Sequence, residues 1–287
     1  MRNRYAIRRQ IDALDPERDH HRLSFLSASH DFPQDTEIAL ALAFFRTFAI
    51  PSIAAVLDVT GEFERAGQKR YDDTTLLLSE MLEHGPDSER GRAAIRRINR
   101  IHAQHSGGHA ITNEDYLYVL TTFIFEPARW NARYGWRPMT AGEKLASFHL
   151  WRRVGALMGI TDLPATYEAM EAFNLRFERE RFRRTPASER VGRATLAILT
   201  NKLPAIPGLR PLVVHAVSSI LDRPVRDAMG FPAPRPSVAT LVHTILRLRA
   251  QVLRHLWPAR RTPFLVTRRK TPTYPAGYSI DSLGPQR

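Results

Sequence analysis

The segment EDYLYVLTTFIFEPARW, residues 114–130, decides the fold class of this chain. Its apolar side chains fall on nearly all sides of a helix, a pattern typical of a helix at the centre of a core. Asn113 comes directly before it as a helix cap. Polar residues interrupt and end the apolar run Tyr116–Phe125, so this run is too short to span a bilayer. We therefore expect a buried central helix in an all-helical protein.

Almost every other patterned segment also has helical spacing. We predict further helices over residues 35–49, 70–84, 141–158, 164–184, 187–202, 209–229 and 236–257, and one between a Ser88 cap and the pair Gly107–Gly108. No alternating strand pattern, internal repeat or low-complexity linker divides the chain. The economical organisation is one all-α domain over residues 1–287, in which the proline-rich residues 258–287 form an extended basic C-terminal tail.

Residues 90–105, RGRAAIRRINRIHAQH, form an amphipathic pattern with an unusual apolar side. At about 100° per residue, His102 and His105 share a sector with Ile95 and Ile98, while arginines fill the opposite arc. A histidine that points into an apolar interior needs a partner. That partner is a hydrogen bond, a metal ion or a haem iron, and the three possibilities imply different functions.

Composition excludes several kinds of site. The chain of 287 residues is 43% hydrophobic and 25% charged, which suits a folded domain with a real core. It has no cysteine, so disulfides, thiolate zinc sites, iron–sulfur clusters and cysteine nucleophiles are excluded. The patterns GxSxG, HExxH, GxxxxGK[ST] and GxGxxG are also absent, which removes the main sequence support for several hydrolase and dehydrogenase classes.

Positive charge is concentrated near the C-terminus. The formal net charge is +13, and residues 206–287 hold thirteen Arg or Lys against three Asp, which accounts for ten of these charges. Because no nucleic-acid-binding motif accompanies the charge, we expect no nucleic-acid partner and favour contact with an anionic membrane surface. The twin arginine Arg8–Arg9 has no apolar run after it, so we expect a cytoplasmic protein, peripheral on the membrane if it meets one.

Three other constellations are candidate sites. His102, His105 and His109 have a spacing that suits a divalent metal, with a carboxylate from elsewhere. Arg70 and Thr74 lie four residues apart, which puts a guanidinium and a hydroxyl on one helical face. Ordinary structural roles are the alternatives: a hydrogen-bonded core histidine for His102, and a salt bridge within the helix to Asp72 or Asp73 near Arg70. The sequence places His149 on a helix surface or facing a pocket.

Together these segments closely resemble the MpaB-type oxygenases, relatives of the rubber oxygenases known as latex-clearing proteins. The likeness runs in order over nearly the whole chain. Its main motifs are TGEFERAGQKRYDDTTLLLSEMLEHG (60–85), DSERGRAAIRRINRIHAQ (87–104), NEDYLYVLTTFIFEPARWNARYGWRP (113–138), LWRRVGALMGITDLPATYEAMEAFN (150–174) and YPAGYSIDSLGP (274–285). Ordered motifs over such a length are more specific than any single spacing.

The resemblance implies an all-α fold with a globin-like core and flanking helices around a b-type haem. It assigns the iron to the histidine of the motif RRINRIH, which is His102 here. In the rubber-cleaving relatives an arginine and a threonine, four residues apart and about thirty residues before this ligand, line the haem pocket. Arg70 and Thr74 match that spacing. The resemblance thus identifies His102 as the iron ligand and Arg70 and Thr74 as pocket residues.

The chain departs from the rubber oxygenases at several positions. Their lysine before the threonine, which is able to cap the iron, is Asp73 here, and their arginine four residues after the ligand is Ser106. Glu62 and Glu64 are the nearby candidates for their catalytic carboxylate. An export signal is also missing, so the chain looks closer to the MpaB branch, which resembles an enzyme that cleaves an isoprenoid side chain.

The leading hypothesis is a haem-dependent oxygenase that uses dioxygen on an alkene of a hydrophobic, polyprenyl-like substrate. In it His102 holds the haem iron, Arg70 contacts a propionate or oxygen, and Thr74 donates to oxygen. One alternative is a non-haem metalloenzyme built on the histidine cluster. The other is a helical protein that carries haem or a lipid without turnover.

Overall fold

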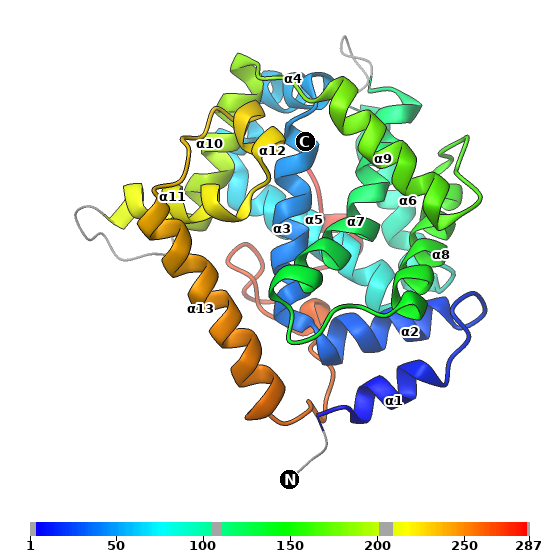
Figure 1. Ribbon diagram of the computed structural model, residues 1–287. Helices are drawn as coiled ribbons and strands as arrows, with labels where there is room; N and C mark the ends of the chain where they lie inside the picture. The colour runs from blue at the N-terminus through cyan, green and yellow to red at the C-terminus, as the bar shows by residue number, and fades with distance from the viewer. Residues whose placement is uncertain (1–3, 105–110, 201–208, 286–287) are drawn as a thin grey trace.

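The computed structural model describes residues 4–104, 111–200 and 209–285, and in these ranges it contains helices and no strand (Figure 1), which confirms the all-α prediction. The α-helices are α1 (Ala6–Asp12), α2 (His20–Leu26), α3 (Pro33–Phe48), α4 (Pro51–Thr60), α5 (Glu62–His84), α6 (Glu89–Gln104), α7 (Asn113–Tyr134), α8 (Ala141–Met158), α9 (Tyr167–Arg181), α10 (Pro186–Thr200), α11 (Leu209–Ile220), α12 (Arg223–Ala228) and α13 (Pro236–His255). A π-helical turn, η1 (Ser27–Asp31), and two 3₁₀ turns, η2 (Val266–Arg268) and η3 (Ile280–Ser282), complete them.

Helix α7 is the predicted central helix. It packs against α3, α8 and α9, and buried side chains occur on all its sides. Its N-terminus is capped by Thr112, whose hydroxyl accepts from the Asp115 amide at 3.2 Å while the Asp115 carboxylate accepts from the Thr112 amide at 3.0 Å. The prediction of Asn113 as the cap is wrong by one residue, because the Asn113 amide group bonds instead to the backbone of Thr161.

Two departures from the predicted helices are due to prolines. The sequence predicts no helix directly after residue 49, yet Pro51 begins α4, since its fixed φ suits a first helical position. The single helix predicted over 209–229 is divided into α11 and α12. Pro224 near the start of α12 explains the break, because its ring in a continuous helix would clash with the carbonyl of Ile220, where α11 ends.

A short turn joins the end of α5 to the start of α6 and fixes the relative position of the two helices. Met81 O accepts from the Gly85 amide at the end of α5, and Ser88 Oγ accepts from the Gly91 amide at 3.0 Å, which confirms Ser88 as the cap of α6. A Cβ on Gly91 would lie 2.0 Å from the carbonyl oxygen of Gly85. Only glycine allows the two helices to approach this closely.

Gly91→Ala is expected to lower the free energy of unfolding by about 3 kcal/mol, because the new methyl group meets backbone that cannot move aside without displacing a helix. Gly142→Ala is the matched control. A Cβ there meets only ordinary contacts, 3.6 Å from Pro16 and 3.8 Å from Thr140, and alanine favours the helix. Urea denaturation followed by circular dichroism measures both. Equal stability of the two variants would contradict the close approach.

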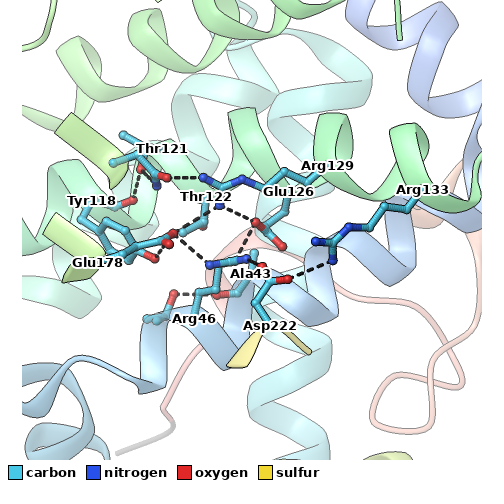
Figure 2. Close-up of polar contacts among 12 residues, drawn as sticks. Ala43, Arg46, Tyr118, Thr121, Thr122, Glu126, Arg129, Arg133, Glu178 and Asp222 are labelled. Atoms are coloured by element: carbon cyan, nitrogen blue, oxygen red, sulfur yellow. Dashed lines mark hydrogen bonds and ion pairs between the residues drawn. The ribbon is translucent and has the colours of Figure 1, made fainter. Parts of the chain in front are cut away.

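A buried ion cluster joins α3, α7, α9 and the residue before α12 (Figure 2). Arg46 pairs with Glu126 at 2.6 Å, with Glu178 at 2.9 Å and with Asp222. Arg129 also bonds to Glu126 and Glu178. Burial opposes the charge of Arg46, but the adjacent carboxylates outweigh it and raise the pKa of this guanidinium above its ordinary value.

The C-terminal segment after α13 wraps back onto α5 and α6. Glu83 of α5 accepts from the amides of Val266 and Thr267, and Glu80 accepts from the Tyr278 hydroxyl at 2.6 Å. Arg97 of α6 donates to Leu283 O at 2.6 Å. The tail predicted over 258–287 is therefore a wrap in its described part, residues 258–285. We call residues 263–285 the C-terminal strap.

No single helix in the described ranges is both long and apolar enough to cross a bilayer. Helices α3 and α4 meet the length and composition test only as a pair, bent by 95° at their junction.

Candidate functional site

The predicted residues Arg70, Thr74 and His102 line one cavity of about 240 Å³. Its walls come from α3, α4, α5, α6, α7, α8 and α10, with Ile111, Ile160 and the end of the strap completing them. Most of the lining side chains are apolar, including Leu77, Met81, Ile98 and others from the core. We call this space the main cavity.

Helical periodicity explains how these side chains reach the main cavity. Along α5, Arg70, Thr74, Leu77 and Met81 recur at intervals of three or four residues, with Leu78 next to Leu77, so they form one stripe. Along α6, Ile101 and His102 lie three and four residues after Ile98 and so share one side of the helix. Because α5 and α6 pack against each other, the two stripes face a common space.

His102 is half-buried and lies beside Tyr116 of α7. The two ring centroids are 4.9 Å apart and the ring planes are inclined by 31°. Burial raises the pKa of Tyr116, and the Asp115 carboxylate adds to this effect. Tyr116 is a cavity residue that sequence reasoning missed, since an aromatic residue in a core helix carries no signal of its own.

Thr74 uses its hydroxyl within its own helix. Its Oγ donates to the carbonyl oxygen of Arg70 at 2.9 Å, the common i−4 bond of threonine in helices. The oxygen still has lone pairs to accept a hydrogen bond. For Thr74 to donate to a molecule in the cavity, its hydroxyl must rotate away from this carbonyl.

Asp73 also lines the main cavity, and it is tied to the C-terminal strap. It pairs with Lys69 at 2.7 Å and accepts from the Tyr274 hydroxyl. Lys69 donates in turn to Gly284 O at 2.7 Å. The Asp73 carboxylate is therefore engaged by a cation and a phenol.

Gly284 and Pro285 of the strap close one side of the main cavity. Gly284 has φ +92°, and a Cβ on it would lie 2.5 Å from Cδ1 of Ile101, the neighbour of His102. The backbone thus passes directly against α6, in a conformation that favours glycine. Sequence patterns did not connect this segment, 182 residues after His102 (284 − 102), with the site.

A second cavity of about 110 Å³ adjoins the main one, and we call it the side cavity. Leu78, Phe123 and Trp151 line both. The rings of Phe123 and Trp151 are in contact, with centroids 4.8 Å apart. Phe264 and Val266 of the strap belong to the side cavity's wall, so one C-terminal segment contributes to both spaces.

The other histidines do not extend the site within the described residues. His149 is half-buried on α8 beside Phe148 and does not line the main cavity, and burial lowers its pKa. His243 Nδ1 bonds to the Tyr134 hydroxyl at 2.7 Å. His105, Ser106 and His109 lie outside the described residues, as do the side chains of Glu62 and Glu64. Where the structure describes side chains, no three His, Asp or Glu form a group suited to a metal ion.

A family model described as the catalytic domain of ER-bound oxygenase mpaB/B' and rubber oxygenase matches residues 35–255. The chain belongs to this family. The resemblance seen in the sequence is therefore confirmed, and the matched range of this oxygenase-domain family includes Arg70, Thr74 and His102. The strap lies beyond it.

Curated proteins of the same oxygenase family are also similar to this chain in sequence. It is 29% identical over 239 residues to "ER-bound oxygenase mpaB'" of Penicillium brevicompactum, covering 78% of this chain and 56% of that protein. It is 34% identical over 137 residues to "ER-bound oxygenase mpaB" of Penicillium roqueforti (strain FM164), covering 47% and 46%. The chain spans about half the length of these curated relatives.

A solved structure of latex clearing protein in its closed state is similar to this chain. The TM-score is 0.54 at 20% sequence identity, over 81% of this chain and 68% of that one. At this identity the match supports the fold alone.

Proposed function

We propose that this protein is a haem-dependent oxygenase that uses dioxygen to cleave an alkene of a hydrophobic, isoprenoid-type substrate. The observation that carries the proposal is the meeting of Arg70, Thr74 and His102 on one largely apolar cavity, in a chain of the oxygenase-domain family. Arg70 and Thr74 lie 32 and 28 residues before His102, too far along the chain for local structure to bring them together. Their presence in one cavity is therefore a property of the fold.

The residues of the main cavity fit a b-type haem in their chemistry. A neutral imidazole is a common axial ligand, and apolar walls suit the faces of a porphyrin. His102 would hold the iron, and Arg70 would pair with a propionate through charge-assisted hydrogen bonds. Haem supplies the activation of dioxygen when it is bound. Thr74 would offer its hydroxyl proton to the oxygen substrate after releasing the carbonyl of Arg70.

The cavity walls support an apolar substrate. A chain of hydrocarbon units gains free energy by leaving water for the space between Leu77, Met81 and Ile98. The side cavity begins at Leu78, Phe123 and Trp151, next to the main one, so the structure offers a second apolar compartment for the part of the substrate beyond the reacting alkene.

The absorption spectrum of freshly purified protein, combined with metal analysis, tests the cofactor. We expect a sharp Soret band and one iron porphyrin per chain. Iron without porphyrin, or one zinc or manganese per chain, would favour the non-haem alternative. Colourless protein that fails to bind added haem in a one-to-one ratio would overturn the haem assignment.

Oxygen consumption tests catalysis separately. The haem-loaded protein is expected to consume dioxygen when a polyprenyl substrate is added and to release carbonyl fragments of the cleaved alkene. A haem protein that binds the substrate without consuming oxygen would instead support the alternative hypothesis of a helical carrier without turnover.

A further inference from the structure

Helix α13 exposes a continuous apolar stripe. Of the eleven large hydrophobic residues exposed in the described part of the chain, six lie between residues 241 and 257. They are Leu241, Ile245, Leu248, Val252, Leu256 and Trp257. The first five recur at intervals of three or four residues, so they follow one side of the helix. Leu248 is 63% exposed and Leu256 is 70% exposed.

The stripe faces outward because other sides of α13 are attached to the protein. His243 bonds to Tyr134 of α7, Arg249 pairs with the buried carboxylate of Asp35 at 2.8 Å, and Ala250 is buried. α13 also packs against α11 and runs along the edge of the molecule (Figure 1). The orientation of the helix is thus fixed by polar contacts, and the exposed leucines are a stable feature of the surface.

The segment of chain that carries the stripe has charge of a single sign. Residues 228–280 contain nine Arg or Lys and no Asp or Glu. Arg260 and Arg261, directly after Trp257, are exposed, and Arg247 and Arg254 are exposed on another side of α13. Each arginine near an anionic lipid surface adds to the attraction between the protein and that surface. An apolar stripe with cations around it has the composition of helices that lie in a membrane interface.

We propose that α13 docks this protein on an anionic lipid surface, with the stripe inserted at the boundary between headgroups and acyl chains. Trp257 would sit at the headgroup level, where tryptophan is enriched. Arg260 and Arg261, directly after Trp257, would contact lipid phosphates. This surface is separate from the main cavity, so the proposal goes beyond the proposed function and holds with or without haem.

The charge distinguishes a lipid surface from other occupants of the stripe. A second copy of this chain would bring two acid-free basic segments together, and their repulsion opposes such a dimer. A nucleic acid would use the arginines but gain nothing from five aliphatic side chains. Among these occupants, only an anionic surface with an apolar interior binds both the arginines and the aliphatic side chains of the stripe.

Tryptophan emission provides a specific signal for this docking. The chain has four tryptophans, and Trp130, Trp136 and Trp151 are buried whereas Trp257 is 60% exposed. With vesicles of equal parts phosphatidylcholine and phosphatidylglycerol, we expect the emission to shift to the blue and brominated acyl chains to quench it. Trp257→Phe should abolish the shift while co-sedimentation persists. An unchanged spectrum in the presence of these vesicles would overturn the proposal.

Co-sedimentation of the full chain with the same vesicles tests the stripe. Leu241→Ser/Leu248→Ser is expected to weaken binding at least about tenfold, because two inserted side chains are lost. The control Val59→Ser/Leu175→Ser removes two exposed apolar side chains elsewhere and should bind as the parent does. Pure phosphatidylcholine vesicles and high salt should both reduce binding.

Two results would overturn the assignment. One is equal binding of the stripe variant and its control to the anionic vesicles. The other is a dimer in sedimentation velocity that the Leu241→Ser/Leu248→Ser variant abolishes, because the stripe would then be occupied by a second copy.

Discussion

Arg46→Met is expected to lower the free energy of unfolding by roughly 3–5 kcal/mol, the cost of breaking a buried ion pair from one side. Only 4% of Arg46 is exposed, and its loss would leave the buried Glu126 and Glu178 sharing a single remaining cation, Arg129. Methionine fills a similar volume, so the effect reports charge and not a cavity. Urea denaturation with extrapolation to water measures it.

The control for Arg46 is Arg133→Met. Arg133 pairs with the same Asp222 at 2.9 Å, but its side chain is largely exposed, so its loss should cost no more than about 1 kcal/mol. Adding Glu126→Gln to Arg46→Met removes one of the stranded charges and should recover part of the stability. If Arg46→Met is as stable as Arg133→Met, the cluster does not hold α3, α7 and α9 together through its charges.

His102→Ala is expected to reduce haem affinity by at least the roughly 10–100-fold that follows loss of a group supporting a metal ligand. Oxygen consumption should fall to background. The prediction rests on the proposed role of His102 and on its place in the wall of the main cavity. Haem titration followed at the Soret band measures the affinity, and free imidazole added to the variant should restore the wild-type spectrum.

His149→Ala is the matched control for His102→Ala, since it removes a half-buried histidine that does not line the main cavity. It should keep haem and activity. Circular dichroism of both variants checks that each remains helical. Full haem binding by a folded His102→Ala protein would contradict the ligand assignment, and loss of haem in both variants would show that neither effect is specific.

Most helices follow from the sequence because local periodicity and capping are local properties. The helix predicted over 141–158 is α8 with the same bounds, and Ser88 caps α6 as expected. The failures are also local. Thr112, and not Asn113, caps α7, and Pro224 divides a predicted helix. Apolar periodicity does not show which of two neighbouring side chains caps a helix or where a proline ends one.

The candidate site was predictable only in part. Spacing placed Arg70 and Thr74 on one helical face and His102 on the apolar side of another, and the resemblance linked the three. Nothing in the sequence placed Tyr116 or the strap in the same cavity, and no sequence pattern distinguished Arg46 of α3 from a surface arginine. These contacts join residues far apart in the chain, and periodicity contains no information about such distances.

By itself, then, the sequence determined most of the helices and their apolar faces, because side-chain direction repeats every 3.6 residues. The three residues proposed for the site came from the resemblance to the oxygenase family. The tertiary structure alone decided that α5 and α6 face one cavity, that Gly284 closes it, and that α13 keeps an apolar face uncovered. Packing is the physical reason. Which apolar face is buried depends on the helices that happen to reach it, and the outer side of α13 is one that none of the described helices reaches.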